Sequence, residues 1–389
     1  MQSRGRKPKT LVTILGSITL NRSVYECPAC HRTRIPADEL LDVNKTKYSP
    51  GCRRLATRAG AQSAFAEGAQ DLWVYAHIQI SPKEVERISK RVGADVAAWQ
   101  AETEERARQA PSAVVIEQPV KTLYVEYDGT GVPMTKREVD GRKGKQDDGS
   151  AKTREAFLGC VFTSTANDAD GFPIRDPEST TYVGGILSSN QFGPRICGEA
   201  IRRGMAHAKR VAVIADGAKK NWSIAETHFP RAIWIVDLYH AREHLYALLH
   251  LLAPDASVYQ DLKTRWLTLL DEGRIEELTH AARLRLTGNS ANDGAAVKEI
   301  NYFDNNIERM RYANFRAQGL FVGSGVMEAG CKTLVGKRLK QPGMFWTVGG
   351  ANSIIALRSA QLSNRINDFW EDRSCKQSQH TDSAALRAA

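Results

Sequence analysis

Residues 119–133, PVKTLYVEYDGTGVP, carry an apolar run up to one carboxylate, Asp128, which is followed at once by Gly-Thr-Gly. Leu123, Val125 and Tyr127 occupy alternate positions before it, the period-2 pattern of a β-strand. In α/β proteins, the loops that follow the carboxyl ends of strands are open to ligands. The sequence therefore predicts a chemical role for Asp128 at the end of a strand.

Two classes of enzyme place an aspartate at such a strand end. A phosphatase of the haloacid-dehalogenase type has a motif that resembles Asp-x-Asp-Gly-Thr, and it needs a nucleophilic Asp two residues before Asp128. This chain has Glu126 at that position. A metal-dependent nuclease or transposase core has no such requirement, so the sequence favours the second class.

A second aspartate, Asp216 in RVAVIADG, repeats the arrangement of Asp128: an apolar strand followed by Asp-Gly. A helix is expected at 195–208 and a shorter one before the last strand. Five strands are predicted, at 123–128, 156–164, 180–187, 210–216 and 232–237. This order is typical of the ribonuclease-H fold, in which the first and fourth strands are neighbours, so Asp128 and Asp216 should lie side by side.

Two carboxylates at close range are unfavourable unless a cation lies between them. Magnesium, a hard ion that prefers oxygen ligands, is the expected cation, with manganese able to replace it. We expect a third ligand from Glu328, in the segment 319–346, GLFVGSGVMEAGCKTLVGKRLKQPGMFW. The alternative for Glu328 is a solvent-facing residue beside a solvated basic surface.

The same segment is basic after Glu328, with no acidic residue between Cys331 and Trp346. A carboxylate and several cations on one helix suit a site that binds a metal and a phosphate backbone together. The side chains expected to contact DNA are Lys332, Lys337, Arg338, Lys340 and Trp346.

The composition agrees with a polyanionic partner without requiring one. The chain has 389 residues, enough for two or three domains, a formal net charge of +10 and a pI near 9.2. No apolar run approaches the roughly 20 residues that span a bilayer. The seven cysteines follow no regular framework and suit a reducing cytoplasm. We therefore expect a cytoplasmic protein, associated with the nucleoid when bound to DNA, and no membrane partner.

The first 52 residues predict a β-hairpin over 9–26, turning at Gly16-Ser17 and ending at Cys27-Pro-Ala-Cys30. Cys-x-x-Cys on a hairpin resembles half of a zinc ribbon. Only His31 and Cys52 could complete a four-ligand site, and adjacent residues such as Cys30 and His31 point to opposite faces of an extended chain. Bound zinc is therefore not expected here.

Residues 53–110 carry helical periodicity and form the expected DNA-binding domain. Ser81 is an expected N-cap with Pro82 at the first helical position, and Gly93 is expected to turn the chain into another short helix. The result resembles a helix-turn-helix, in which the second helix enters the major groove. A plain helical bundle is the alternative.

The rest of the chain divides by pattern into four expected parts. A ribonuclease-H-like core covers 119–240, and an all-α insertion follows at 241–318. The core then resumes at 319–370 with the helices that carry Glu328, and the polar tail 371–389 is predicted to be disordered.

Several of these motifs together resemble the DDE transposases of bacterial insertion sequences. The order Asp128, Asp216, helical insertion, Glu328 is theirs, and YDGTGVPM, IADGAKKNW, DLYHAREHL and the segment 319–346 are similar to the ISKra-type branch, which is related to Mutator-like elements. The similarity runs from about residue 10 to about residue 370. Asp237 and His240 resemble the Asp-x-x-His motif of Mutator-like transposases and are expected near the scissile phosphate; a hydrogen-bonded structural cap is the alternative for this pair. Members often carry a second Cys-x-x-Cys upstream, which this sequence lacks.

The resemblance implies a transposase that binds the terminal inverted repeats of its own element as a homo-oligomer on double-stranded DNA. The three carboxylates would hold two magnesium ions for cleavage and strand transfer. One alternative is a structure-specific nuclease or resolvase, which hydrolyses DNA without joining strands. Another is a domesticated DNA-binding protein that has lost catalysis.

Overall fold

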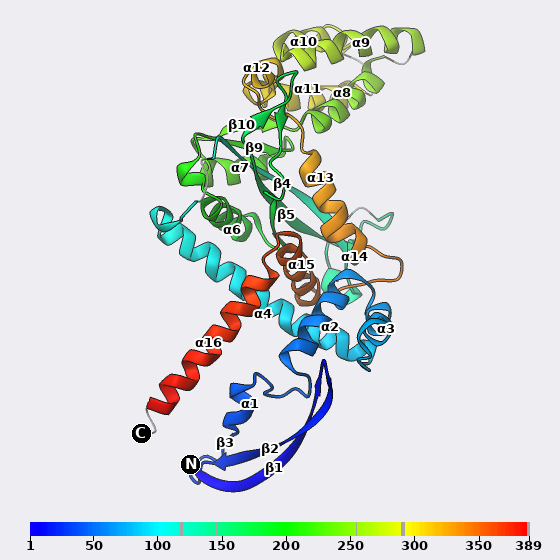
Figure 1. The fold of residues 1–389 in the computed structure, drawn as a ribbon. Helices are drawn as coiled ribbons and strands as arrows, with labels where there is room; N and C mark the ends of the chain where they lie inside the picture. Colours follow the sequence, from blue (N-terminus) through cyan, green and yellow to red (C-terminus); the bar gives the residue numbers. More distant parts are fainter. Residues whose placement is uncertain (117–119, 145, 254, 289–291, 387–389) are drawn as a thin grey trace. The chain divides into compact units, whose positions relative to one another are not determined.

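The computed structural model describes residues 1–116, 120–144, 146–253, 255–288 and 292–386, and side chains up to residue 377. The chain forms two compact units (Figure 1). Unit 1 contains residues 1–100, 133–140 and 336–389, and unit 2 contains residues 101–132 and 141–335. In the described part of the chain, no helix is both long enough and apolar enough to cross a bilayer.

Unit 1 begins with the expected hairpin, whose strands are longer than predicted. Strands β1 (Gln2–Thr13) and β2 (Gly16–Glu26) pair antiparallel, and β3 (Thr33–Arg34) pairs with β2. Thr13 pairs with Gly16, so the tight turn consists of residues 14 and 15 instead of Gly16-Ser17. Gly16 opens β2 at φ 113°, a conformation that glycine adopts without a steric penalty.

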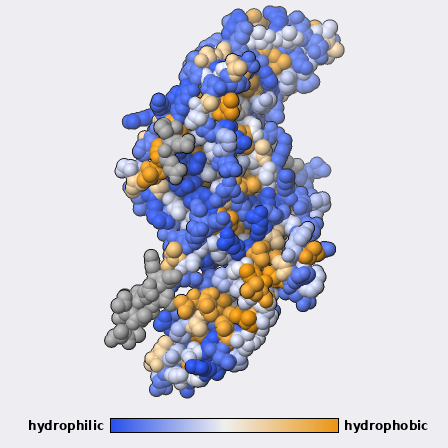
Figure 2. Space-filling model, viewed as in Figure 1, coloured by the Kyte–Doolittle hydropathy of each residue, from blue (hydrophilic) through white to orange (hydrophobic). Residues whose placement is uncertain are grey.

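Helices make up the rest of unit 1, and they expose apolar side chains. They are α1 (Pro36–Leu40), α2 (Pro50–Gln62), α3 (Phe65–Ala76), the first part of α4 (Pro82–Gln109), α5 (Lys136–Val139), α14 (Lys337–Leu339), α15 (Val348–Leu362) and α16 (Ile366–Leu386). Trp73, Val74 and Tyr75 of α3 are exposed, and so are Ile14 and Leu15 in the turn of the hairpin. Figure 2 shows hydrophobic residues gathered on the part of the face that carries the N-terminal elements.

Helix α4 corrects the predicted helix-turn-helix. Ser81 accepts a hydrogen bond from the Glu84 amide (3.2 Å), as expected of an N-cap. However, α4 continues without a break through Gly93 to Gln109. A Cβ on Gly93 would collide with the backbone of Ser353 in α15, so this glycine permits close packing of two helices instead of a turn.

The end of the chain also differs from the prediction. Helix α16 extends to Leu386 over a segment for which a disordered tail was predicted from residue 371. Arg373 in this helix forms ion pairs with Asp42 and with Asp95 (both 2.8 Å). These two ion pairs fix the first half of α16 within unit 1.

Unit 2 is built on a mixed five-stranded sheet with the order β10-β9-β4-β5-β8. Its strands are β4 (Thr122–Pro133), β5 (Thr153–Ser164), β8 (Thr181–Gly185), β9 (Arg210–Ala215) and β10 (Ile233–Val236); β6 (Ala166–Asn167) and β7 (Pro173–Ile174) form a separate pair. Strand β9 pairs parallel with both β4 and β10, and β5 pairs antiparallel with β8. All five predicted strands are confirmed, and the first and fourth are neighbours, as the ribonuclease-H order requires.

Helices cover both faces of this sheet, which explains why consecutive residues of its central strands are buried. Helices α6 (Ser189–Arg202) and α7 (Lys219–His228) lie on one side, and α13 (Gly325–Cys331) lies on the other (Figure 1). Helix α6 packs tightly on β5, since a Cβ on Gly159 would lie 2.8 Å from Ile196. Phe162 stacks on Tyr124 in the neighbouring strand at a centroid distance of 5.0 Å.

The segment after β10 is helical, as predicted. Its elements are α8 (Leu238–Leu252), α9 (Ala256–Glu272), α10 (Ile275–Arg283), α11 (Asp293–Asp304), a 3₁₀ turn (Ile307–Met310) and α12 (Tyr312–Ala317). Leu245, Leu249 and Trp266 are buried in it. A π-helical turn (Lys332–Gly336) then follows α13 and leads to α14.

Candidate active site

Three aspartates lie at the same level of three adjacent strands. In the β4–β9 register Glu126 pairs with Ile214, and Asp128 and Asp216 each lie two residues further on. In the β9–β10 register Ala215 pairs with Val236, so Asp216 and Asp237 are level as well. Adjacent strands lie about 4.8 Å apart. The parallel pairing therefore places Asp128 beside Asp216, as predicted, but Asp128 lies inside β4 instead of at the predicted strand end, because β4 continues through Gly129-Thr-Gly to Pro133.

Asp128 and Asp216 influence each other electrostatically. Burial and the neighbouring charge of Asp216 raise the pKa of Asp128, while His240 and Lys220 act in the opposite direction. Each aspartate accepts its hydrogen bonds through Oδ1: Asp128 from the Gly129 amide (2.6 Å), and Asp216 from the Ala218 amide (2.9 Å) and the Asn221 side chain (2.6 Å). No described residue donates to Oδ2 of either carboxylate, so each has an oxygen available for a ligand.

Glu328 is not gathered with this pair. It lies on α13, where its side chain is 63% exposed and forms an ion pair with Lys332 (2.6 Å). Among the described residues, no three His, Cys, Asp or Glu side chains form a group that could hold a metal ion. The structure thus brings Asp128 and Asp216 together and leaves Glu328 paired with a lysine.

Buried Asp237 pairs with half-buried His240 beside the two aspartates. Asp237 caps α8 and accepts hydrogen bonds from the Tyr239 amide (3.1 Å), His240 Nδ1 (2.8 Å) and the Ser324 hydroxyl (2.5 Å). Burial alone would raise the pKa of Asp237, but the bonds to His240 and Ser324 lower it. The hydrogen bond to Asp237 raises the pKa of His240 to about 9, helped by the negative charge of Asp128. His240 is therefore a cation at neutral pH, close to Asp128.

Glu126 is a functional residue that the sequence analysis missed. It is fully buried and accepts a hydrogen bond from the Met327 amide (2.9 Å) in the first turn of α13. Burial raises the pKa of Glu126 to about 8, so it is neutral at pH 7. Together with the bond from Ser324 to Asp237, this contact fixes the start of the helix that carries Glu328. In the sequence, the only sign of this role is that Glu126 is a carboxylate within the otherwise apolar run LYVEY.

Gly217, the residue after Asp216, is required by its surroundings. A Cβ at this position would collide with the ring of Tyr302 from α11. The Tyr302 ring stacks on His244 at a centroid distance of 3.6 Å, and His244 pairs with Glu299 (2.6 Å). The helical insertion therefore packs directly against the Asp216-Gly217 loop.

The basic segment after Glu328 divides into exposed and buried residues. Lys332, Lys337 and Lys340 are exposed. Arg338 is fully buried within unit 1, where its Nε donates to the Gly60 carbonyl (3.0 Å) at the end of α2.

Two aromatic rings enclose the Arg338 guanidinium. It lies 4.6 Å from the ring centroid of Phe65 and 5.1 Å from that of Trp346. Trp346 is only 5% exposed, and its indole N–H donates to the Leu339 carbonyl (3.0 Å). These contacts correct the assignment of Arg338 and Trp346 as DNA contacts, because neither side chain reaches the surface of unit 1.

The Cys-x-x-Cys pair follows the hairpin, and His31 and Cys52, which could complete a zinc site with it, have other surroundings. Cys30 is exposed, and hydrogen bonds from the amides of Cys30 and Ala29 lower the pKa of Cys27. His31 Nδ1 instead lies 3.0 Å from Glu26 Oε1. Cys52 is buried in α2, where burial raises its pKa.

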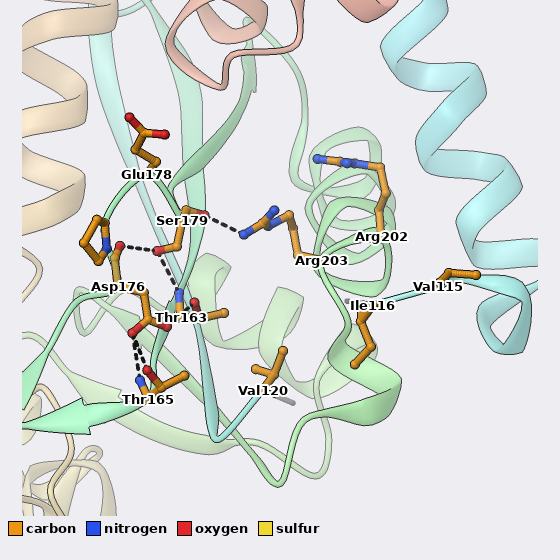
Figure 3. A pocket seen from close by; sticks show the side chains of 11 residues that line it. Val115, Ile116, Val120, Thr163, Thr165, Asp176, Glu178, Ser179, Arg202 and Arg203 are labelled. Carbon is orange, nitrogen blue, oxygen red and sulfur yellow. Dashed lines mark hydrogen bonds between the residues drawn. The ribbon is translucent and has the colours of Figure 1, made fainter. Parts of the chain in front are cut away.

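A separate pocket of about 640 Å³ lies in unit 2 away from the three aspartates (Figure 3). It is lined by Asp176, Ser179 and Arg203 among others, and Arg203 donates to the Ser179 carbonyl (2.9 Å). The Asp176 carboxylate accepts hydrogen bonds from the Thr163 and Thr165 hydroxyls (2.6 and 2.7 Å). These contacts fix the loop around Asp176. None of the candidate site residues lines this pocket.

No family model matches the chain, and no curated protein matches it. Among solved structures, the chain is similar to one described as the Drosophila P element transposase strand transfer complex. The sequence identity is 8%, the match covers 81% of this chain and 92% of that chain, and the TM-score is 0.36. These values are too low to establish a shared fold, so the function proposed below rests on the sheet and carboxylates of this chain.

Proposed function

We propose that this chain is a metal-dependent DDE transposase of the insertion-sequence type, which binds the terminal repeats of its element and cleaves and joins DNA there. One observation carries the proposal. Asp128, inside β4 where its parallel pairing with β9 ends, lies level with Asp216, directly after β9, in a sheet with the order β10-β9-β4-β5-β8.

The donor set fits magnesium. Both aspartates offer carboxylate oxygens, the ligands this hard cation prefers, and each has an oxygen that no described residue uses. The pKa of Asp128 is raised in part because Asp216 lies close by, which is the repulsion that a cation would remove. When bound, metal ions at these residues would activate a water or a DNA 3′-hydroxyl and stabilise the leaving oxygen.

Glu328 would be the third ligand, in place of its ion pair with Lys332. Two buried acidic side chains fix the start of its helix. Asp237 accepts a hydrogen bond from the Ser324 hydroxyl just before α13, and Glu126 accepts one from the Met327 amide in the first turn. Both contacts orient the backbone that presents Glu328. This leaves the Lys332 contact, which is exposed and therefore weak, as the interaction to be replaced.

His240 would place a positive charge at the substrate phosphate. Its pKa of about 9 keeps the ring protonated at neutral pH, and Asp237 fixes the ring through Nδ1 (2.8 Å). A protonated imidazole attracts a phosphate oxygen and leaves the two aspartates to the metal. Exposed Lys337 and Lys340 supply phosphate contacts outside the site.

The test is a cleavage and joining assay with purified protein, Mg²⁺ and a plasmid that carries the DNA flanking the encoding gene. We expect Asp128→Asn and Asp216→Asn to abolish strand cleavage while DNA affinity changes by less than about threefold, because neither change removes a phosphate contact. Asp261→Asn is the matched control, since that side chain is 69% exposed on α9. Comparable cleavage by an Asp128 or Asp216 variant would overturn the assignment of the site.

The same assay separates the alternatives. Cleavage without joined products would identify a structure-specific nuclease or resolvase. DNA binding without cleavage in either Mg²⁺ or Mn²⁺ would identify a domesticated binding protein. The transposase predicts both cleaved and joined products, and a homo-oligomer that assembles on DNA.

A further inference from the structure

A second pocket opens beside the Asp216-Gly217 loop, between α7 of the core and α11 of the helical insertion. Its volume is about 700 Å³, within the usual range for small-molecule sites. Gly217 lies at one side of the pocket, next to the candidate catalytic Asp216. Tyr302 also lines it, and its ring rests against Gly217. The pocket therefore lies next to the loop that carries Asp216.

The aromatic side of this pocket is rigid. Trp222 stacks on Trp234 with a centroid distance of 6.3 Å. The guanidinium of Arg309 lies 4.6 Å from the Trp222 ring centroid and donates to the Asn306 side chain (3.1 Å). Trp222, Asn306 and Arg309 are thus held in place before any ligand arrives.

The rest of the lining is polar and positively charged. Lys219 and Lys298 are exposed on opposite helices, and neither forms an ion pair with a described residue. Together with Arg309 they outnumber the single acidic group in the lining, Glu226. The exposed amide of Asn301 offers both a donor and an acceptor, the groups that the edge of a nucleic-acid base recognises.

Two buried polar groups in the lining, the Trp222 indole N–H and the Tyr302 hydroxyl, have no hydrogen-bond acceptor among the described residues. The Tyr302 hydroxyl lies against the Gly217 backbone. Burial and the charges of Asp216 and Asp237 raise the pKa of Tyr302, so its hydroxyl stays protonated and can donate. An unused donor between the pocket and the carboxylates suits an incoming phosphate or sugar oxygen.

We infer that this pocket binds one unpaired nucleotide of the DNA strand that enters the active site. Lysine cations suit its phosphate, the Asn301 amide suits a base edge, and the Arg309 guanidinium, held against Trp222, suits a base face. A duplex does not fit, because a volume of about 700 Å³ holds only one small ligand. This inference rests on the proposed function and names a substrate element for it.

The experiment measures affinity without catalysis. Full-length protein in EDTA is titrated into two fluorescent 20-base-pair duplexes of the same sequence, one fully paired and one with a single unpaired adenosine. We expect the wild type to bind the bulged duplex about fivefold more tightly. Asn301→Ala and Lys298→Ala should reduce this preference to less than twofold. Arg265→Ala, which removes a 70% exposed cation from the same insertion, should keep it.

Each result decides a separate question. Equal affinity of the wild type for the two duplexes, or an unchanged preference in Asn301→Ala, would overturn the inference while leaving the proposed function intact. Failure to bind either duplex would overturn the proposed function and the inference with it. Loss of the preference on adding millimolar dAMP, with binding of the paired duplex unchanged, would support the inference, because the free nucleotide would then compete with the unpaired nucleotide for one pocket.

Discussion

Replacing Glu126 by Gln should stabilise unit 2 at neutral pH. Glu126 is fully buried, and the pKa of its carboxyl is raised from 4.5 to about 8 by burial. Its Oε2 accepts a hydrogen bond from the Met327 amide, a role that a glutamine oxygen can take over. Its Oε1 has no partner among the described residues, so the amide group of glutamine loses no contact there.

The sign follows from the two pKa values. Between pH 4.5 and about 8 the folded protein holds a proton on Glu126 that the unfolded chain has released. The free energy of unfolding therefore falls as pH rises, by about 1.4 kcal/mol per pH unit. At pH 7 the accumulated cost is roughly 3 kcal/mol, which glutamine avoids. For a unit of this size, that is roughly 6–12 °C in melting temperature.

The assay compares thermal unfolding of wild type and Glu126→Gln from pH 5 to pH 8 in EDTA. We expect the two proteins to have similar melting temperatures near pH 5 and to diverge as pH rises. Glu226→Gln makes the same chemical change at an exposed position and should follow the wild type at every pH. Parallel pH profiles for wild type and Glu126→Gln, or a less stable variant at pH 7, would show that Glu126 is ionised in the folded protein.

Three further predictions follow from contacts described above. In salt titrations of DNA binding, the double variant Lys337→Ala/Lys340→Ala should reduce the log–log slope by about 2. Arg338→Leu should leave this slope unchanged, but it should lower the stability of unit 1 in thermal unfolding. Asp237→Asn should lower the His240 pKa from about 9 towards 6.5, as measured by NMR titration of the ring. The pair stabilises the fold fully below pH 6.5 and loses this effect as pH rises to about 9, so the variant should lack this pH dependence. Elemental analysis should find less than one zinc per chain, because the hairpin's Cys-x-x-Cys pair has no further ligands among the described residues; one tightly bound zinc would contradict this.

The sheet could be predicted from sequence because its strands are buried on both faces. Helices cover each side, so the strands contain short, mostly apolar runs, and Asp128 and Asp216 stand out as the polar residues at which two of these runs stop. Asp128 and Asp216 were identified for this reason, as was the pairing of the first and fourth strands. The order of strands along the chain allowed few topologies, since parallel neighbours need a helical connection.

Long-range packing could not be predicted in the same way. Gly93 resembles a turn signal in the sequence, yet it lies inside α4 because Ser353, far along the chain, approaches its backbone. From the sequence, Glu126 indicates only that the nucleophilic Asp of a haloacid-dehalogenase-type phosphatase is missing. Its role depends on Met327, 201 positions later, and no local pattern indicates that contact.

Arg338 is different, because its burial was available from local spacing. Leu334, Val335, Arg338 and Leu339 follow the i, i+1, i+4, i+5 pattern of one helical face, and all four are buried. Lys337 and Lys340, three residues apart, share the opposite face and are exposed. The cations of this segment therefore belong to two groups with different roles: exposed lysines and a buried arginine. The apolar neighbours of a basic residue at helical spacing indicate whether it can reach DNA, and here they separate two surface lysines from an arginine that stabilises the end of α2.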